Sequence, residues 1–125
     1  MGKGKLEVVA RWLIAVPLLL FGLNSFFNFM PTPPLTGNIA AFMNGLMATG
    51  YFLPFLGLAY IFIAVLLIFN RWVPLALVVL APISIQIILY HIFLDLPTIL
   101  PGLIIFLLNI YLGVKHFDAY RPMFK

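Results

Sequence analysis

The sequence contains no cysteine and few charged side chains, and both absences limit what the protein can be. Of its 125 residues, only 8% are charged, whereas 65% are hydrophobic. A water-soluble domain normally carries about 25% charged residues, so this composition cannot cover a soluble surface. Without cysteine, disulfides, thiolate nucleophiles, iron–sulfur ligation and c-type haem attachment are excluded. The composition therefore predicts an integral membrane protein.

The few basic residues predict a topology. All seven lie before the first long apolar segment, between the second and third, or after the fourth: Lys3, Lys5, Arg11, Arg71, Lys115, Arg121 and Lys125. Because Lys and Arg concentrate in cytoplasmic loops, both termini and the middle turn are expected in the cytoplasm, in a bacterial-type cytoplasmic membrane. The formal charge of +4 is spread singly beside apolar segments, which favours contact with an anionic lipid surface over nucleic-acid binding.

The four apolar segments predict an all-α membrane protein, an antiparallel bundle of four transmembrane helices in one domain, residues 1–125. A membrane-spanning helix needs about 20 apolar residues. The predicted spans cover about residues 8–29, 51–69, 73–94 and 98–114. Pro17 and Pro82 interrupt the first and third spans, where each removes a backbone donor and is expected to kink the helix.

The first extracytoplasmic loop contains a further amphipathic segment. Its apolar residues recur at the spacing of one helical face: Ile39, Phe42, Met43, Leu46 and Met47. Asn38 is the expected N-cap. The segment is too short to cross a bilayer. The sequence therefore predicts a short helix over 39–47 that either lies in the outer interface or dips between the spans.

Polar side chains gather in the outer halves of two predicted spans. The first and third spans both run outward, so their C-terminal halves lie at the same depth. Those halves and the turn that follows contain the candidate ligand-binding residues Asn24, Asn28, Gln86, Tyr90, His91 and Asp95. Polar groups inside a membrane need partners and often mark functional sites. Asn109, on the inward-running fourth span, lies deeper and stands apart from this group.

Helical phase divides the polar residues of the third span into two stripes. Ser84, His91 and Asp95 lie within one narrow stripe, whereas Gln86 and Tyr90 point well away from it. The phase of a single helix does not decide which stripe faces the bundle interior.

Among the candidate residues, His91 can take part in the most kinds of chemistry. A histidine can donate or accept a proton, or hydrogen-bond a lipid-soluble ligand. The alternative is a packing role, because polar side chains between spans often bond a neighbouring helix. Asp95 lies in the turn just before Thr98 and is expected to cap a helix. Arg11, one turn inside the first span, is expected to extend its side chain to the inner headgroups.

Several kinds of chemistry are excluded by residue number and topology. The acidic residues are Glu7, Asp95 and Asp118, and the second histidine is His116. Only Asp95 shares the outer side with His91, so neither a metal cage, nor a carboxylate pair, nor a bis-histidine haem site is expected. A glycine-rich phosphate loop is also missing. We find no catalytic constellation, and the sequence favours a protein that is not an enzyme.

Short sequence patterns along nearly the whole chain are similar to those of one family. They are Arg11, Gly22-Leu23-Asn24-x-Phe26-Phe27, Phe42 with Thr49-Gly50-Tyr51, Asn70-Arg71-Trp72-Val73-Pro74-Leu75-Ala76-Leu77, Ala81-Pro82 with Tyr90-His91-x-Phe93-Leu94, and Tyr120-Arg121-Pro122. In their order and spacing the chain resembles the DoxX/DoxD-like small membrane proteins. The resemblance implies a four-helix membrane bundle associated with quinone-linked or redox-defence proteins. It carries over no catalytic residues and, without cysteine, no thiol chemistry.

The resemblance and the polar cluster together favour a redox-accessory subunit that holds a hydrophobic ligand, a quinone or a lipid, in an outer-leaflet pocket. One alternative is an assembly factor that binds another membrane protein and has no ligand chemistry. A weaker alternative is a small oligomeric transporter or channel. Gly57 and Ala64, seven residues apart on the second span, offer a small-residue seam for a homodimer.

Overall fold

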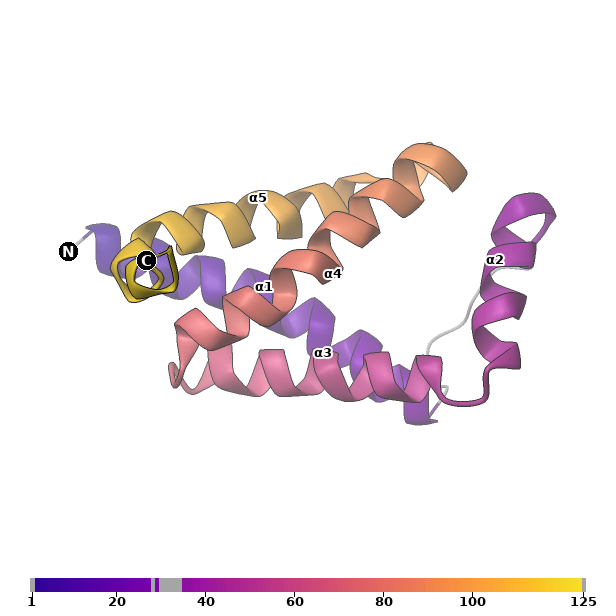
Figure 1. Ribbon diagram of the computed structural model, residues 1–125, viewed down its shortest axis with the longest axis horizontal. Coiled ribbons are helices and arrows are strands. Elements are labelled where there is room, and N and C mark those ends of the chain that lie inside the picture. The colour runs from indigo at the N-terminus through magenta and orange to yellow at the C-terminus, as the bar shows by residue number, and fades with distance from the viewer. Residues whose placement is uncertain (1, 28, 30–34, 125) are drawn as a thin grey trace.

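Wherever the structure describes the chain, all regular secondary structure is helical, as the sequence predicts. The structure is a computed structural model that describes residues 2–27, 29 and 35–124. Its α-helices are α1 (Gly2–Phe27), α2 (Gly37–Ala48), α3 (Phe52–Ile68), α4 (Val73–Leu94) and α5 (Leu100–Lys115) (Figure 1). Short 3₁₀ helices follow at Leu96–Thr98, Phe117–Ala119 and Arg121–Phe124.

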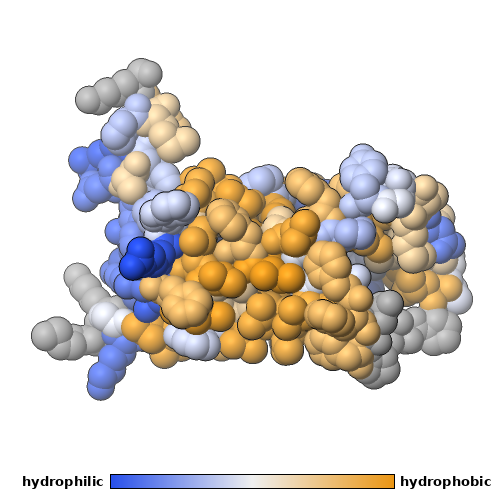
Figure 2. Space-filling view, turned by 90° about the horizontal axis from the view of Figure 1, so that it is seen from below, coloured by the Kyte–Doolittle hydropathy of each residue, from blue (hydrophilic) through white to orange (hydrophobic). Residues whose placement is uncertain are grey.

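The helices have the length and the surface of a membrane protein. Residues Gly4–Phe27 of α1 and Val73–Leu94 of α4 are each long and apolar enough to cross a bilayer, whereas α2 and α3, bent by 89° at their junction, reach that length only when they are taken together. Figure 2 shows an apolar band across the middle of the molecule, with hydrophilic residues gathered at one end. Phe55 and Val114, 64% and 68% exposed, belong to a surface that suits lipid rather than water.

The helices pack as two close pairs, α1 with α3 and α4 with α5, and further contacts join α3 to α4 and α1 to α5. Both chain termini and the 70–72 turn lie at one end, which we call the terminal end (Figure 1). From there α4 diverges from α3 toward the opposite end, where α2 stands across the molecule; we call this the α2 end. The apolar core between the helices includes Ile14, Leu18, Ile63, Leu67, Leu77, Leu80 and Leu112.

Two glycines allow α1 and α3 to come into backbone contact. A Cβ atom on Gly22 would lie 2.9 Å from the carbonyl oxygen of Gly57, and one on Gly57 would lie 2.8 Å from the Cβ of Ser25. Close approach of this kind supplies the van der Waals packing that holds helices together in lipid. Ala64 is also fully buried. The small-residue stripe predicted as a dimer seam is therefore occupied within the chain, by α1.

Arg11 is buried against the end of α3. The side chain is 9% exposed, and its Nη1 donates to the carbonyl oxygen of Leu67 over 2.6 Å. Leu67 lies in the last turn of α3, where carbonyls lack partners in the helix and carry partial negative charge. The expectation that Arg11 extends to the headgroups is therefore wrong, because the carbonyl end of the neighbouring helix provides a nearer partner.

The same end of α3 closes with a left-handed residue. Asn70 has φ of +54°, a conformation that asparagine tolerates better than most residues. The backbone N–H of Asn70 donates to Leu67 over 3.4 Å, and that of Arg71 donates to Leu66 over 2.9 Å. This is the pattern of a Schellman cap. It gives the Leu66 carbonyl a partner and the Leu67 carbonyl a second partner besides Arg11, and it turns the chain sharply into α4.

Some predicted boundaries and caps differ from the observed ones. The loop helix α2 is longer than the predicted 39–47. Thr36 rather than Asn38 occupies its N-cap position, and no side chain caps it. The last helix begins at Leu100, later than predicted, because the preceding residues form a separate 3₁₀ turn. Pro17 and Pro82 lie inside α1 and α4, which both continue past them.

Replacing Gly22 by valine should destabilise the protein by about 1–3 kcal/mol, the usual cost of overpacking, because the new side chain meets the backbone of α3. Gly113→Val is the matched control, since a Cβ atom on Gly113 meets nothing within 4 Å. Unfolding in mixed micelles by SDS titration measures the difference. Equal midpoints for the two variants would contradict the close contact between α1 and α3.

Replacing Arg11 by methionine should cost about 1.5–3 kcal/mol, the range for hydrogen bonds to charged groups, because the charged bond to Leu67 is lost while the apolar stem is kept. Arg71→Gln removes one positive charge from an exposed side chain and should leave stability nearly unchanged. The same titration compares the two variants. If Arg11→Met were as stable as Arg71→Gln, the hydrogen bond from Arg11 to α3 would make no measurable contribution to stability.

Candidate functional site

The structure distributes the predicted ligand residues over two helix pairs. Asn24 belongs to α1, which packs on α3, whereas Gln86, Tyr90 and His91 belong to α4, with Asp95 just beyond its end. The sixth, residue 28, lies outside the described residues. The C-terminal ends of α1 and α4 both point toward the α2 end (Figure 1). Contacts join three members of the group, Tyr90, His91 and Asp95.

His91, Asp95 and Thr98 form one hydrogen-bonded unit at the end of α4. Nδ1 of His91 lies 3.1 Å from the backbone carbonyl oxygen of Asp95 and 3.3 Å from Oγ1 of Thr98. The Thr98 hydroxyl donates to Oδ2 of Asp95 over 2.6 Å, which leaves its oxygen only as an acceptor. Nδ1 therefore faces acceptors alone, so it must carry the proton. In the neutral ring, Nε2 is then a hydrogen-bond acceptor.

Asp95 orients its neighbours instead of capping a helix. It occupies the N-cap position of the 3₁₀ helix Leu96–Thr98, but its side chain makes no capping bond. The prediction that Asp95 caps a helix is therefore wrong. Its carboxylate accepts a hydrogen bond from the Thr98 hydroxyl and not from a backbone N–H of the helix. Thr98 is a member of the unit that sequence reasoning missed.

Glycine makes room for the imidazole on the facing helix. A Cβ atom on Gly102 of α5 would lie 3.4 Å from Cδ2 and 3.8 Å from Nε2 of His91, and 2.6 Å from a methyl carbon of Ile87. The ring therefore packs directly on the α5 backbone. Within the described part of the chain, Nε2 has no hydrogen-bond partner.

A row of three rings connects α2 to this unit. The Phe42 ring lies 5.5 Å from that of Tyr90, tilted by 47°, and the Tyr90 ring meets that of His91 edge-on at 5.0 Å. These separations suit favourable ring pairs. Tyr90 thus joins the His91 unit, although helical phase turned it away, whereas its predicted partner Gln86 is exposed. Phe42 places α2 beside the site.

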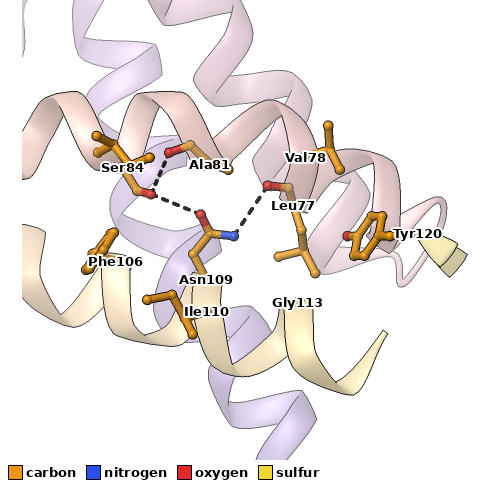
Figure 3. A pocket seen from close by; sticks show the side chains of 10 residues that line it. Leu77, Val78, Ala81, Ser84, Phe106, Asn109, Ile110, Gly113 and Tyr120 are labelled. Carbon is orange, nitrogen blue, oxygen red and sulfur yellow. Dashed lines mark hydrogen bonds between the residues drawn. The ribbon is translucent and has the colours of Figure 1, made fainter. Parts of the chain in front are cut away.

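A second polar group lies between α4 and α5, and sequence reasoning missed it. Ser84 Oγ donates to Oδ1 of Asn109 over 3.0 Å, and Nδ2 of Asn109 donates to the Leu77 carbonyl over 3.3 Å (Figure 3). Ser84 and Asn109 are 1% and 7% exposed. Asn109 is therefore paired, not isolated. The sequence contained a signal for this pair. Ser84 precedes Leu96 in the turn by 12 residues and Asn109 follows Pro97 in the turn by 12. In two antiparallel helices joined by that turn, the two residues therefore lie at the same depth.

The surface beside this pair is hollowed into a groove between α4 and α5 of about 220 Å³ (Figure 3). Its walls are apolar and include Leu77, Val78, Ile85, Phe106 and Ile110, and Gly113 forms part of it. Tyr120 lines it toward the terminal end, where the phenol donates to the Pro74 carbonyl over 2.7 Å. Burial raises the pKa of Tyr120, so its hydroxyl stays a donor at neutral pH. None of the five predicted ligand residues that the structure describes lines this groove.

Comparison with known proteins gives no relative: no protein-family model, no curated protein and no solved structure matches the chain. The resemblance to DoxX/DoxD-like proteins therefore stays a prediction. Among the described residues, no three His, Asp or Glu side chains come together as a metal site. What the molecule can do must be inferred from the His91 unit and from the exposed surface.

The Ser84–Asn109 bond should appear as coupling in a double-mutant cycle. Ser84→Ala leaves the buried Oδ1 of Asn109 without its donor, and Asn109→Leu removes one of the two acceptors of the Ser84 hydroxyl, which keeps the Ala81 carbonyl at 3.0 Å. The double variant loses the bond between the two side chains only once. We expect the double variant to be more stable than additivity predicts by about 0.6 kcal/mol, the average for hydrogen bonds between membrane helices, and by no more than about 1.7. SDS titration measures all four proteins. Strict additivity would show that the two side chains do not interact.

Proposed function

We propose that α1, α3, α4 and α5 each cross the membrane, as in a DoxX/DoxD-like four-helix bundle, with α2 at the extracytoplasmic surface. The two shorter helices, α3 and α5, contain 17 and 16 residues. At 1.5 Å per residue each is about 25 Å long, close to the roughly 30 Å hydrocarbon core. The basic residues Arg11, Arg71 and Lys115 belong to the terminal end, which supports a cytoplasmic position for that end.

We further propose that the protein is a non-catalytic accessory subunit that holds a quinone-like molecule at the α2 end, for use by a redox partner in the membrane. The observation that carries this proposal is the state of His91. Asp95 fixes its Nδ1 as a donor, and its Nε2 is left without a partner beside Gly102. The ring is only partly buried, so Nε2 can be reached from outside the bundle, where a ligand hydroxyl would bond it.

The tautomer of His91 specifies which ligand group fits. A neutral ring with Nε2 as acceptor takes a hydrogen bond from the hydroxyl of a quinol or another phenol-headed lipid. The protonated ring would instead donate to a quinone carbonyl, so proton uptake by His91 would match the change between the two ligand forms. Tyr90 provides an aromatic face beside the imidazole, and Thr98 holds the carboxylate of Asp95. Asn24 remains a candidate on the opposing helix pair.

The second candidate function, an assembly factor, is favoured by α2. This helix has no buried residue, and Met47 on its apolar stripe is 52% exposed. An apolar helix that stands across the end of the bundle presents a surface to another membrane protein. In this alternative, Phe42 and Tyr90 serve only to hold α2 in place, and His91 has a packing role.

Mass spectrometry of the hydrophobic molecules that co-purify with gently solubilised protein tests the ligand proposal. Wild type should retain a stoichiometric quinone or phenol-headed lipid, and His91→Leu should lose it. Thr98→Val should bind about tenfold more weakly, a change of about 1.4 kcal/mol, since it removes the hydroxyl that holds the Asp95 carboxylate. Gln86→Leu is the matched control, because it removes an exposed polar side chain from the same helix and should bind like wild type.

Two outcomes would contradict the ligand proposal. If wild type carries only bulk phospholipid, or if His91→Leu retains the ligand as well as Gln86→Leu does, His91 is structural. Crosslinking in native membranes then tests the assembly-factor function. That function is supported if wild type captures one membrane protein and the Met47→Asp variant does not.

A further inference from the structure

We propose that the turn between α3 and α4, residues 69–72, is a lipid-contact surface at the terminal end of the molecule. In this proposal the Trp72 ring lies among the headgroups of the bilayer, and Arg71 binds anionic headgroups beside it. The inference goes beyond the accessory function. It rests on the proposal that α4 crosses the membrane, and it does not depend on any ligand at the α2 end.

Trp72 has a backbone conformation that does not suit its side chain. Its φ of +52° and ψ of +38° lie in the left-handed region, where a bulky residue is an outlier and glycine or asparagine is the usual choice. Asn70 of the same turn follows that preference at φ of +54°. The shape of the turn therefore does not explain why residue 72 is a tryptophan.

Packing within the chain does not explain the tryptophan either. Trp72 is 66% exposed, and its side chain makes no hydrogen bond or ring contact with the other described residues. Phe69, at the start of the turn, is 69% exposed. Tryptophan is enriched where membrane meets water, because its ring is apolar and its N–H can bond the wet headgroups. The contact that favours tryptophan here therefore lies outside the chain.

The length of α4 puts Trp72 at the depth of the headgroups. The helix begins at Val73 and has 22 residues, so it is about 33 Å long at 1.5 Å per residue. The hydrocarbon core of a bilayer is about 30 Å thick. A helix of this length that crosses the core leaves the residue before it just outside the hydrocarbon, and Trp72 is that residue.

The C-terminal segment lies at the same depth. The Tyr120 hydroxyl donates to the carbonyl of Pro74, two residues beyond Trp72. In Figure 1 the last turns of the chain are seen end-on, whereas the long helices lie in the plane of the picture, so this segment runs across the bundle. A segment with this direction at this depth runs along the membrane surface. Phe124, which is 76% exposed, adds a second aromatic side chain to that layer.

Arg71 provides a positive charge beside the ring. It is exposed. Among the described residues, the ion pair that the structure shows joins Arg121 to Asp118, and no acidic side chain pairs with Arg71. Basic side chains next to a membrane surface attract anionic lipids. Unlike Arg121, Arg71 can therefore offer its whole charge to a lipid phosphate.

Tryptophan fluorescence in phosphatidylcholine vesicles, with bromine on the acyl chains either close to the headgroups or close to the chain ends, tests the depth of the ring. The chain has two tryptophans, so Trp12→Phe leaves Trp72 as the only reporter. We expect shallow bromine to quench Trp72 more strongly than deep bromine. Ile85→Trp, with both native tryptophans replaced by phenylalanine, is the control. Ile85 is 50% exposed near the middle of α4, so deep bromine should quench this variant more strongly.

The proposal is overturned if aqueous acrylamide quenches Trp72 and neither lipid does, while deep bromine quenches Ile85→Trp. The turn would then face water, where a soluble protein would be its partner. If Ile85→Trp also escapes deep bromine, α4 does not cross the membrane, and the proposed topology fails together with this surface.

Adding phosphatidylglycerol to the vesicles tests the role of Arg71. The emission of Trp72 should shift to shorter wavelengths, because anionic headgroups draw the turn into the headgroup layer. Arg71→Gln should lose this shift. Arg121→Gln is the matched control and should keep it, since Arg121 is already paired with Asp118. An equal shift in the two variants, or no shift in the Trp12→Phe protein, would show that Arg71 does not bind the headgroups.

Trp72→Asn separates lipid contact from a structural role. Asparagine tolerates the left-handed conformation better, so this variant should unfold in SDS titration at a midpoint no lower than that of wild type. A loss as large as that of Gly22→Val would mean that the ring packs on the chain itself, and the proposal would fail.

Discussion

An unpaired polar atom inside a membrane finds no water to bond, and this constraint organises most of the molecule. The buried polar side chains give donors to backbone carbonyls: Arg11 to Leu67, Asn109 to Leu77, Tyr120 to Pro74 and His91 to Asp95. The first three bonds join segments far apart in the chain, so each also fixes one element against another. Among the described residues, one fully buried side-chain polar atom departs from this pattern, the hydroxyl of Tyr111, which has no partner. Nε2 of His91, on a partly buried ring, also has no partner, and we propose a ligand for it.

The two helix pairs meet this constraint in different ways, and the difference has functional consequences. Between α1 and α3, glycines bring the backbones together and leave no space. Between α4 and α5, a serine–asparagine bond holds the middle, and a groove stays open beside it. In addition, α4 diverges from α3 toward the α2 end (Figure 1). The proposed ligand site belongs to α4, in the less tightly closed pair.

The sequence predicted the elements better than the contacts. Long apolar segments and the apolar periodicity of residues 39–47 were enough to locate every α-helix to within a few residues at most boundaries, although α1 begins earlier than expected. Helical phase within one segment gives a face but not what that face meets. It placed Ser84 and His91 on one face of α4, and both do meet α5, but it could not predict that Ser84 bonds Asn109 whereas His91 packs on Gly102. Arg11 was misplaced for the same reason: an arginine near a membrane surface has two kinds of partner, and only the packed structure shows that the end of α3 lies closer than the headgroups.

The proposed function depends on the state of His91, which Asp95 and Thr98 hold with its proton on Nδ1 and with Nε2 open to a ligand. ¹⁵N NMR of histidine-labelled protein tests this directly, with His116→Gln used to assign the two rings. We expect the ¹⁵N resonances of His91 to show the proton on Nδ1 in the ligand-free protein. When a phenol-headed lipid is added, only the resonance of Nε2 should change. A proton on Nε2 in the ligand-free protein, or spectra that the lipid leaves unchanged, would contradict it.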